Sequence, residues 1–176
     1  VAIGAALAGF VQGLSGFGYS MTAMALWAWT LEPMLAAPLA VFGGLTGQII
    51  QAVTQRRGFH WRALLPFLLG GLAGLPLGLW LLPQLDMVWF KLVLGAFLVI
   101  VCPTMALAHH LPALRPPAPV QRACDGMAGV IGGVMSGLGG FAGVVPTLWC
   151  QLRRMLKDEQ RQVIQNFNLM MLAITF

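Results

Sequence analysis

The spacing of the charged residues constrains this chain more than any other feature. Only 9% of its 176 residues are Asp, Glu, Lys or Arg, whereas soluble domains carry about 25%. Long stretches contain no charged residue at all, among them 1–31, 33–55, 63–85 and 126–152. Each exceeds the roughly 20 apolar residues that a helix needs to cross a bilayer. The composition therefore excludes a soluble globular protein and predicts a membrane protein.

Charged and proline-rich breaks divide the chain into six hydrophobic segments. They cover about 1–30, 34–54, 63–83, 88–108, 126–150 and 162–176, and we expect the last to be incomplete. A membrane barrel would need strands of about ten residues that alternate polar and apolar side chains. The run Leu77-Gly78-Leu79-Trp80-Leu81-Leu82 shows no such alternation. We therefore predict an all-α, polytopic membrane helix bundle in the cell membrane.

The net charge of +5 does not indicate a nucleic-acid partner. The basic residues lie in short loops between apolar segments instead of forming a stripe with interleaved aromatic residues. The three cysteines show no metal-ligand spacing, and no known catalytic motif is present in its required context. We therefore expect no metal, no cofactor, no nucleic acid and no enzymatic activity. The lipid bilayer is the expected environment, and homo-oligomerisation stays open.

A proline-rich stretch at 109–125 separates two similar glycine-rich regions. Gly9 to Tyr19 reads GFVQGLSGFGY, and Val130 to Gly140 reads VIGGVMSGLGG. A shift of 121 residues superposes Ser15-Gly16-Phe17-Gly18 on Ser136-Gly137-Leu138-Gly139. This match favours an internal duplication, although glycine-rich matches also arise by chance. We interpret 1–108 as a first repeat, 109–125 as a linker and 126–176 as a second repeat that is incomplete at its C-terminus.

The loop charges test this topology because cytoplasmic loops are rich in Lys and Arg. The loops with Arg56, Arg57 and Arg62, and with Arg115 and Arg122, fall on one side of the predicted bundle. The basic loop 153–161 would fall on the other side if segment 126–150 crossed once. A re-entrant hairpin, a functional vestibule or a wrong segment count would each explain this exception. We favour a hairpin or a broken helix.

Glycines in the middle of the membrane segments require an explanation, because each costs about 1 kcal/mol relative to Ala in a helix. Close helix packing is one answer, and Gly9 to Gly13 form a GxxxG motif. An unwound helix is the other, because its freed N–H groups and half-helix N-terminus attract an anion at the membrane midplane. Pro146 follows the second glycine run and favours a break there.

Polar residues inside the segments are neutral, and no charged residue is expected deep in the membrane. Backbone amides, hydroxyls and carboxamides could bind an oxyanion through hydrogen bonds without a full counter-charge. Interhelical hydrogen bonding is the simpler interpretation of Gln48 and Gln51, which share a helix face. Asn166 and Asn168 are two residues apart, so we expect a break or a helix start there, with a site role for at least one of them.

The glycine pattern resembles that of the sulfite exporter (TauE/SafE) family of permeases. The resemblance lies in Gly9 to Tyr19, in Gly129 to Pro146, and in the G-x-x-x-G-x-x-x-G formed by Gly70, Gly74 and Gly78. It implies a secondary transporter that moves small sulfur oxyanions such as sulfite or organosulfonates, often as an exporter. Carried over by position, it implies substrate binding by Gly13, Ser15, Gly16, Gly18, Gly133, Ser136, Gly137, Gly139, Gly140 and Asn166. The glycines would expose backbone amides, and Ser15, Ser136 and Asn166 would donate hydrogen bonds.

Two other functions stay open. A structural or assembly subunit of a membrane complex would use its glycines for packing alone, and would show continuous glycine faces along its helices. A transporter would instead bring polar groups from both halves to one cavity. An intramembrane enzyme is disfavoured, because Gly13-Leu14-Ser15-Gly16-Phe17 lacks an acid or histidine companion in the membrane.

Overall fold

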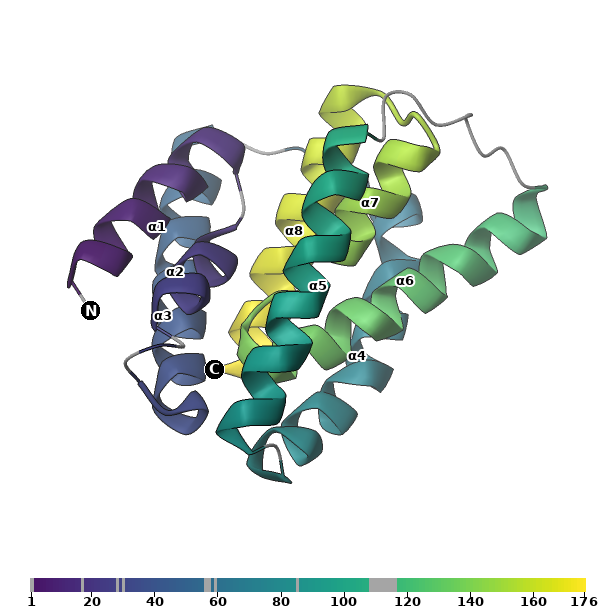
Figure 1. The fold of residues 1–176 in the computed structure, drawn as a ribbon. Helices are drawn as coiled ribbons and strands as arrows, with labels where there is room; N and C mark the ends of the chain where they lie inside the picture. Colours follow the sequence, from purple (N-terminus) through teal and green to yellow (C-terminus); the bar gives the residue numbers. More distant parts are fainter. Residues whose placement is uncertain are drawn as a thin grey trace.

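The computed structural model describes residues 2–16, 18–27, 29, 31–55, 58, 60–84, 86–107 and 117–176. Within them the regular elements are all helical, as predicted (Figure 1). In chain order they are α1 (Ala2–Ser15), α2 (Tyr19–Trp27), α3 (Pro33–Gln55), α4 (Trp61–Leu81), the 3₁₀ turn η1 (Leu82–Gln84), α5 (Met87–Leu107), α6 (Ala118–Gly139), α7 (Val144–Leu152) and α8 (Lys157–Thr175). Residues 109–116 of the predicted linker lie outside the described residues.

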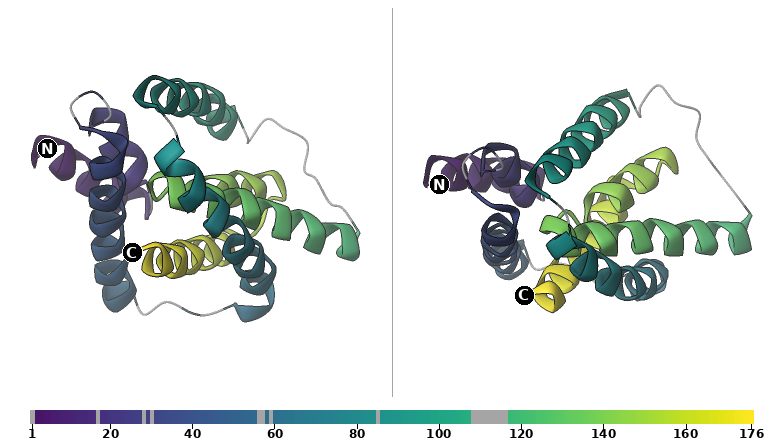
Figure 2. Two further views of the ribbon diagram at one scale, coloured as in Figure 1. Left: turned by 90° about the horizontal axis from the view of Figure 1, so that it is seen from below. Right: turned by 60° about the horizontal axis from the view of Figure 1, so that its bottom comes forward.

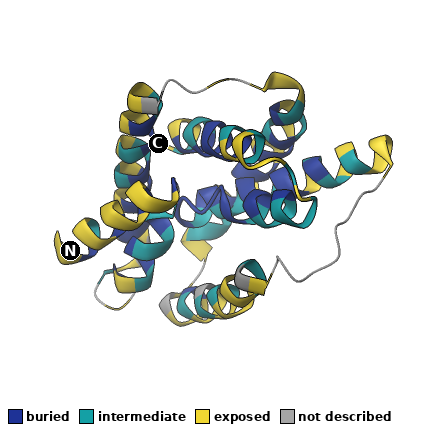
Figure 3. Cartoon of the chain, turned by 90° about the horizontal axis from the view of Figure 1, so that it is seen from above, coloured by how far each residue is buried: buried dark blue, intermediate teal, exposed yellow. Residues whose placement is uncertain are grey.

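Three helices in the described part of the chain are long and apolar enough to cross a membrane. These candidate spans are Met34–Thr54, Trp61–Gln84 and Val88–Met105. Many large apolar side chains are exposed, and Val99 on α5 is 73% exposed. Figure 3 shows exposed positions along the outer sides of the helices. Such a surface is costly in water but favourable against lipid tails. The chain is therefore built as an integral membrane protein.

The predicted segment 1–30 forms two helices in place of one. Helix α1 ends at Ser15, and α2 begins at Tyr19. Between them Gly16 and Gly18 have φ angles of 81° and 98°, a left-handed conformation that glycine adopts without steric cost. Segment 126–150 is also divided, because Gly140 closes α6 with φ of 77° and α7 begins at Val144. Both short helices, α2 and α7, have nine residues.

Helix α6 begins at Ala118, so the last eight residues of the predicted linker are helical. Pro117 is the N-cap and Pro119 lies in the first turn, where a proline removes no intrahelical hydrogen bond. This extension places Asp125 inside the helix, where it is 4% exposed. The prediction that no charged residue lies deep in a segment is therefore wrong at this position.

Helix α8 is continuous, so the predicted break or helix start at Gln165 to Asn168 is wrong. The helix begins eight residues before Gln165 and continues to Thr175. Every residue from Val163 to Asn168 is buried, so this part of α8 is enclosed on all sides. Asn166 and Asn168 lie on one unbroken helix, and because they are two residues apart their side chains project in different directions.

Helices α4 and α6 run in parallel and touch backbone to backbone (Figure 2). A Cβ atom added to Gly70, Gly74 or Gly78 of α4 would overlap a carbonyl of α6. A Cβ added to Gly133 would likewise overlap the carbonyl of Gly71. This is the close approach that small-xxx-small patterns allow in membranes. The G-x-x-x-G-x-x-x-G of α4 is thus a packing surface.

Two loops that are rich in basic residues lie at the same end of the molecule. His60 Nδ1 lies 2.6 Å from Gln162 Oε1, and the Asn166 carboxamide donates to the Gly58 carbonyl over 3.1 Å. These bonds join the α3–α4 connection to α8, whose start follows the 153–156 turn. At the opposite end, Lys91 Nζ lies 5.6 Å from the centre of the Trp29 ring. Figure 1 shows why the two basic loops share one end of the molecule: α6 descends from the upper side, and α7 returns towards that side.

Candidate functional site

A small polar pocket lies where the two interrupted helix pairs meet. It has room for about one water molecule. Its lining comes from α1, α2, α3, α8 and both helix interruptions: Gln12, Gly18, Tyr19, Ser20, Met21, Gly44, Gly140, Phe141, Gly143, Val144, Asn168 and Leu172. None of these twelve residues carries a charge. We call it the inner pocket.

The N-termini of the two short helices face the inner pocket from opposite halves of the chain. Gly18 to Met21 contribute the first turn of α2, and Gly140 to Val144 contribute the start of α7. The first N–H groups of a helix have no acceptor within it, and they carry the positive end of the helix dipole. Two such ends at one pocket favour an anion without a cationic side chain.

Buried polar side chains complete the lining. Gln12 is 3% exposed and Asn168 is 6% exposed, and neither Gln12 Oε1 nor Asn168 Oδ1 has a hydrogen-bond partner. A half-turn of the terminal torsion of Asn168 would bring its N–H groups to the pocket in place of Oδ1. Ser20 Oγ donates to the Ala40 carbonyl over a long 3.2 Å. An unpaired buried polar group costs free energy. A polar ligand that pairs with these groups would remove that cost, so they favour its binding.

Two glutamines of α3 hold the interruption between α1 and α2. Gln48 Nε2 donates to the Gly16 carbonyl over 2.9 Å, and Gln51 Nε2 donates to the Gln12 carbonyl over 2.8 Å. The Gln12 carbonyl lies in the last turn of α1 and the Gly16 carbonyl directly follows that helix, where α-helical hydrogen bonding is incomplete. The interhelical interpretation of Gln48 and Gln51 is therefore confirmed. They stabilise the backbone shape that brings Gly18 to the pocket.

The structure brings two of the predicted site residues into the inner pocket, Gly18 and Gly140. Gly16 lies beside the Gln165 carboxamide, just outside it. Ser15 is exposed, and its hydroxyl donates to the Val11 carbonyl of its own helix. Gly13 is also exposed, with open space where a Cβ would lie.

The other predicted residues have structural neighbours instead. Ser136 Oγ lies 2.9 Å from Thr175 Oγ1, and Asn166 holds the Gly58 carbonyl. Gly133 and Gly137 contact the backbone of α4. Gly139 lies against Phe141 and Met24. At these positions the structure shows the packing alternative that the sequence left open.

Sequence reasoning missed Ser20 and Gln12 as site residues, and it chose Asn166 over Asn168. All three missed residues were recognisable as polar side chains inside apolar segments. Their orientation could not be predicted without the start of α2 and the register of α8. A serine in the first turn after a glycine break was the one available signal for Ser20.

A buried ion pair lies outside the inner pocket, between α6 and the end of α7. Arg153 Nη1 and Trp149 Nε1 both lie 2.6 Å from Asp125 Oδ1. These bonds satisfy the buried carboxylate and tie α7 to α6. Among the described residues, no group of three or more His, Cys, Asp or Glu side chains could hold a metal ion.

An all-helical membrane protein with two half-helix N-termini at one polar pocket has the architecture of a secondary transporter. The chain belongs to the sulfite exporter TauE/SafE family, because the family model matches residues 1–176, its whole length. This is a family of membrane transporters of sulfite and sulfonates. No curated protein and no solved structure matches the chain.

Proposed function

We propose that the inner pocket binds a small sulfur oxyanion such as sulfite, and that the protein exports this anion across the cell membrane. The observation that carries the proposal is the convergence of α2 and α7, from the two halves of the chain, on one uncharged polar pocket. The hydroxyl of Ser20 and the carboxamide of Asn168 supply side-chain hydrogen bonds there. The N-terminal ends of α2 and α7 supply the electrostatic attraction through their helix dipoles.

The order of the elements supports an internal duplication. In each half a helix ends at a left-handed glycine, a nine-residue helix follows, and a long helix comes next. These triplets are α1–α2–α3 and α6–α7–α8. In Figure 1 α1 ascends whereas α6 descends, so the triplets have opposite directions. Such an inverted pair places its binding site at the interface of the two repeats, near the middle of the bilayer.

The inner pocket is closed around a volume near that of one water molecule, which is smaller than an anion with three oxygens. Transport therefore requires the two triplets to separate at the pocket on one side at a time. The glycines of α4 and α6 allow these two helices to pack tightly against each other. Side chains of Tyr19 and Ser20 on α2 contact glycines of α3, so these contacts hold α2 to α3. We propose that α1–α2–α3 move as one body against α4 and α6–α8.

Subunits that use glycine for packing alone are the competing class. The continuous glycine surface between α4 and α6 fits that class, but it lies apart from the inner pocket. Packing alone does not account for the unpaired Gln12 Oε1 and Asn168 Oδ1 atoms at the meeting point of two helix starts. The transporter proposal accounts for both features. The glycine surface makes α4 and α6 part of one rigid body, and the inner pocket lies where α1–α2–α3 would move against that body.

Sulfite efflux from proteoliposomes tests the proposal with a matched pair of serine variants. Ser20→Ala removes a hydroxyl that lines the pocket, and a hydrogen bond to a charged group contributes about 1.5–3 kcal/mol, so efflux should fall about tenfold or more. Ser136→Ala removes a hydroxyl that bonds Thr175 and lines neither cavity, and efflux should stay within about twofold of the unmodified rate. Equal rates for all three proteins, or no efflux at all, would contradict the proposal.

A further inference from the structure

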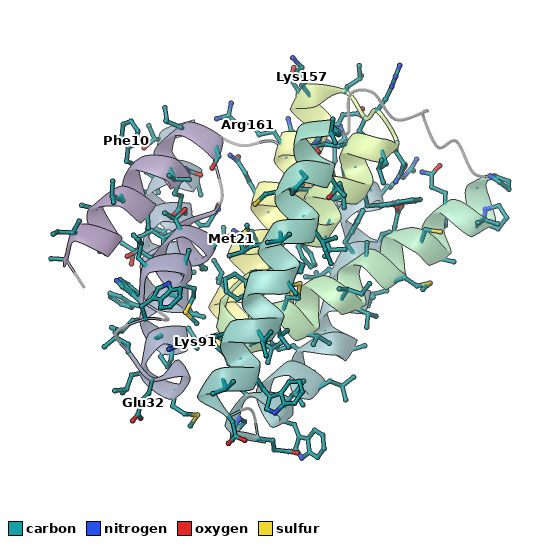
Figure 4. All side chains as sticks on the ribbon, in the orientation of Figure 1. Phe10, Met21, Glu32, Lys91, Lys157 and Arg161 are labelled. Carbon is teal, nitrogen blue, oxygen red and sulfur yellow. The ribbon has the colours of Figure 1, made fainter. Side chains whose placement is uncertain are left out.

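A second cavity, which we call the vestibule, lies at the basic end of the molecule. Its volume is about 900 Å³. Its charged lining residues are Arg154, Lys157 and Arg161 against one carboxylate, Asp158. Among the described residues the one ion pair joins Arg153 to Asp125, so none of these three cations is neutralised by a salt bridge. Figure 4 shows Lys157 and Arg161 at the upper end of the bundle, and Glu32 at the opposite end.

The vestibule is about one helical turn from the inner pocket on α7 and α8, and it also adjoins the pocket at the interruption between α1 and α2. Around the first interruption, Ser15 lines the vestibule and Gly18 lines the inner pocket. On α7, Thr147 lines the vestibule and Val144 lines the inner pocket. On α8, Gln165 lines the vestibule, and Asn168 lines the pocket three residues later. Three helical residues rise about 4.5 Å. The two cavities are therefore neighbours along a single path.

Gln165 lies between the two cavities with an unpaired donor. Its side chain is 3% exposed, and its Nε2 has no hydrogen-bond partner. The same carboxamide lies against Gly16, in the interruption between α1 and α2. Gln151, which also lines the vestibule, has an unpaired Oε1. A buried donor without an acceptor costs free energy, and an oxyanion that enters from the vestibule would supply one.

We propose that the vestibule is an outer anion-binding site, in which Arg154, Lys157 and Arg161 recruit the oxyanion and Gln165 passes it to the inner pocket. This inference rests on the proposed function. It also assigns a side. The vestibule shares its end of the molecule with the α3–α4 connection, whose flanking arginines indicate the cytoplasm. The protein therefore collects its anion from the cytoplasm, as an exporter must.

Steady-state sulfite transport by the full-length protein in proteoliposomes, with the vestibule side facing the sulfite, tests the inference. Arg161→Gln should raise the KM for sulfite about threefold or more at low ionic strength, with kcat changed less, because a charge at the entrance acts mainly on capture. Arg122→Gln removes the same charge from an exposed position on α6, and its KM should equal that of the unmodified protein. Gln165→Leu should lower kcat/KM, and it keeps the vestibule charges.

Ionic strength gives a second measurement that a folding defect would not mimic. Added potassium chloride should raise the KM of the unmodified protein, since salt screens charges at a solvent-exposed surface. The triple variant Arg154→Gln, Lys157→Gln, Arg161→Gln should lose this dependence. Sulfite transport with an unchanged KM in Arg161→Gln and in the triple variant would overturn the proposal of an outer anion site in the vestibule. It would not contradict the proposed site in the inner pocket. Absence of sulfite transport in the unmodified protein would overturn both.

Discussion

Gly140 shows how one residue can fix both the backbone and the ligand pocket. Its φ of 77° closes α6 in the left-handed region, and its N–H donates to the Ser136 carbonyl. A Cβ at this position would lie 2.7 Å from Ser20 Oγ. The residue therefore has to be glycine for conformational and for steric reasons. Because it has no side chain, it leaves space beside the Ser20 hydroxyl in the pocket.

Gly140→Ala should destabilise the protein by about 1–2 kcal/mol, the usual cost of a left-handed non-glycine residue. The apparent unfolding temperature in detergent measures this change. Gly13→Ala is the matched control, because Gly13 is helical with nothing within 4 Å of an added Cβ. Alanine there should leave stability unchanged or raise it by up to about 1 kcal/mol. Equal losses in the two variants would contradict the conformational argument.

The sequence identified glycines more successfully than side-chain donors, and the reason is physical. A left-handed turn favours glycine, so the glycine type marked Gly16, Gly18 and Gly140 as candidates for such turns. The direction of a hydroxyl depends on where its helix begins. Ser15 ends α1 and bonds within it, whereas Ser20, in the first turn of α2, lines the pocket.

At the scale of elements, spacing alone did not distinguish glycines that pack from glycines that open a helix. Gly74 and Gly133 meet the opposite backbone along the α4–α6 contact, whereas Gly18 and Gly140 end helices. Both kinds occur in glycine-rich apolar runs. Six segments could be predicted from charge-free lengths, but the division of the first and fifth into half-helices depends on tertiary contacts such as the one between Gln48 and Gly16.

Gly74→Ala tests the α4–α6 contact. The added methyl group would overlap the Val130 carbonyl, and because both atoms belong to backbone, the helices must move apart. We expect a loss of about 3 kcal/mol, at the upper end for overpacked sites, measured as a lower apparent unfolding temperature. Gly95→Ala on α5 adds the same methyl group into open space. A Gly74→Ala protein as stable as Gly95→Ala would show that the backbones do not touch.

At the scale of the whole molecule, the basic loops explain the exception in the charge pattern. Because α7 returns towards the end at which α6 begins, the turn 153–156 and the α3–α4 connection lie on one side. The interruption between α6 and α7 fits the broken helix that we favoured, and the functional role of the vestibule is the proposal made above. A count of Lys and Arg could not show that these loops share a side, since it required the direction of each half-helix.

Sulfite-dependent thermal stability of the purified full-length protein tests the central claim, that α2 and α7 form an anion site with Asn168. At a sulfite concentration about a hundredfold above Kd, binding should stabilise the unmodified protein by about 2.7 kcal/mol. Asn168→Asp keeps the shape but adds negative charge, so this gain should disappear, and Asn168→Leu should reduce it. Gln84→Glu makes the same change on the exposed η1 turn and should keep the full gain. An undiminished sulfite-dependent rise in Asn168→Asp would contradict the account.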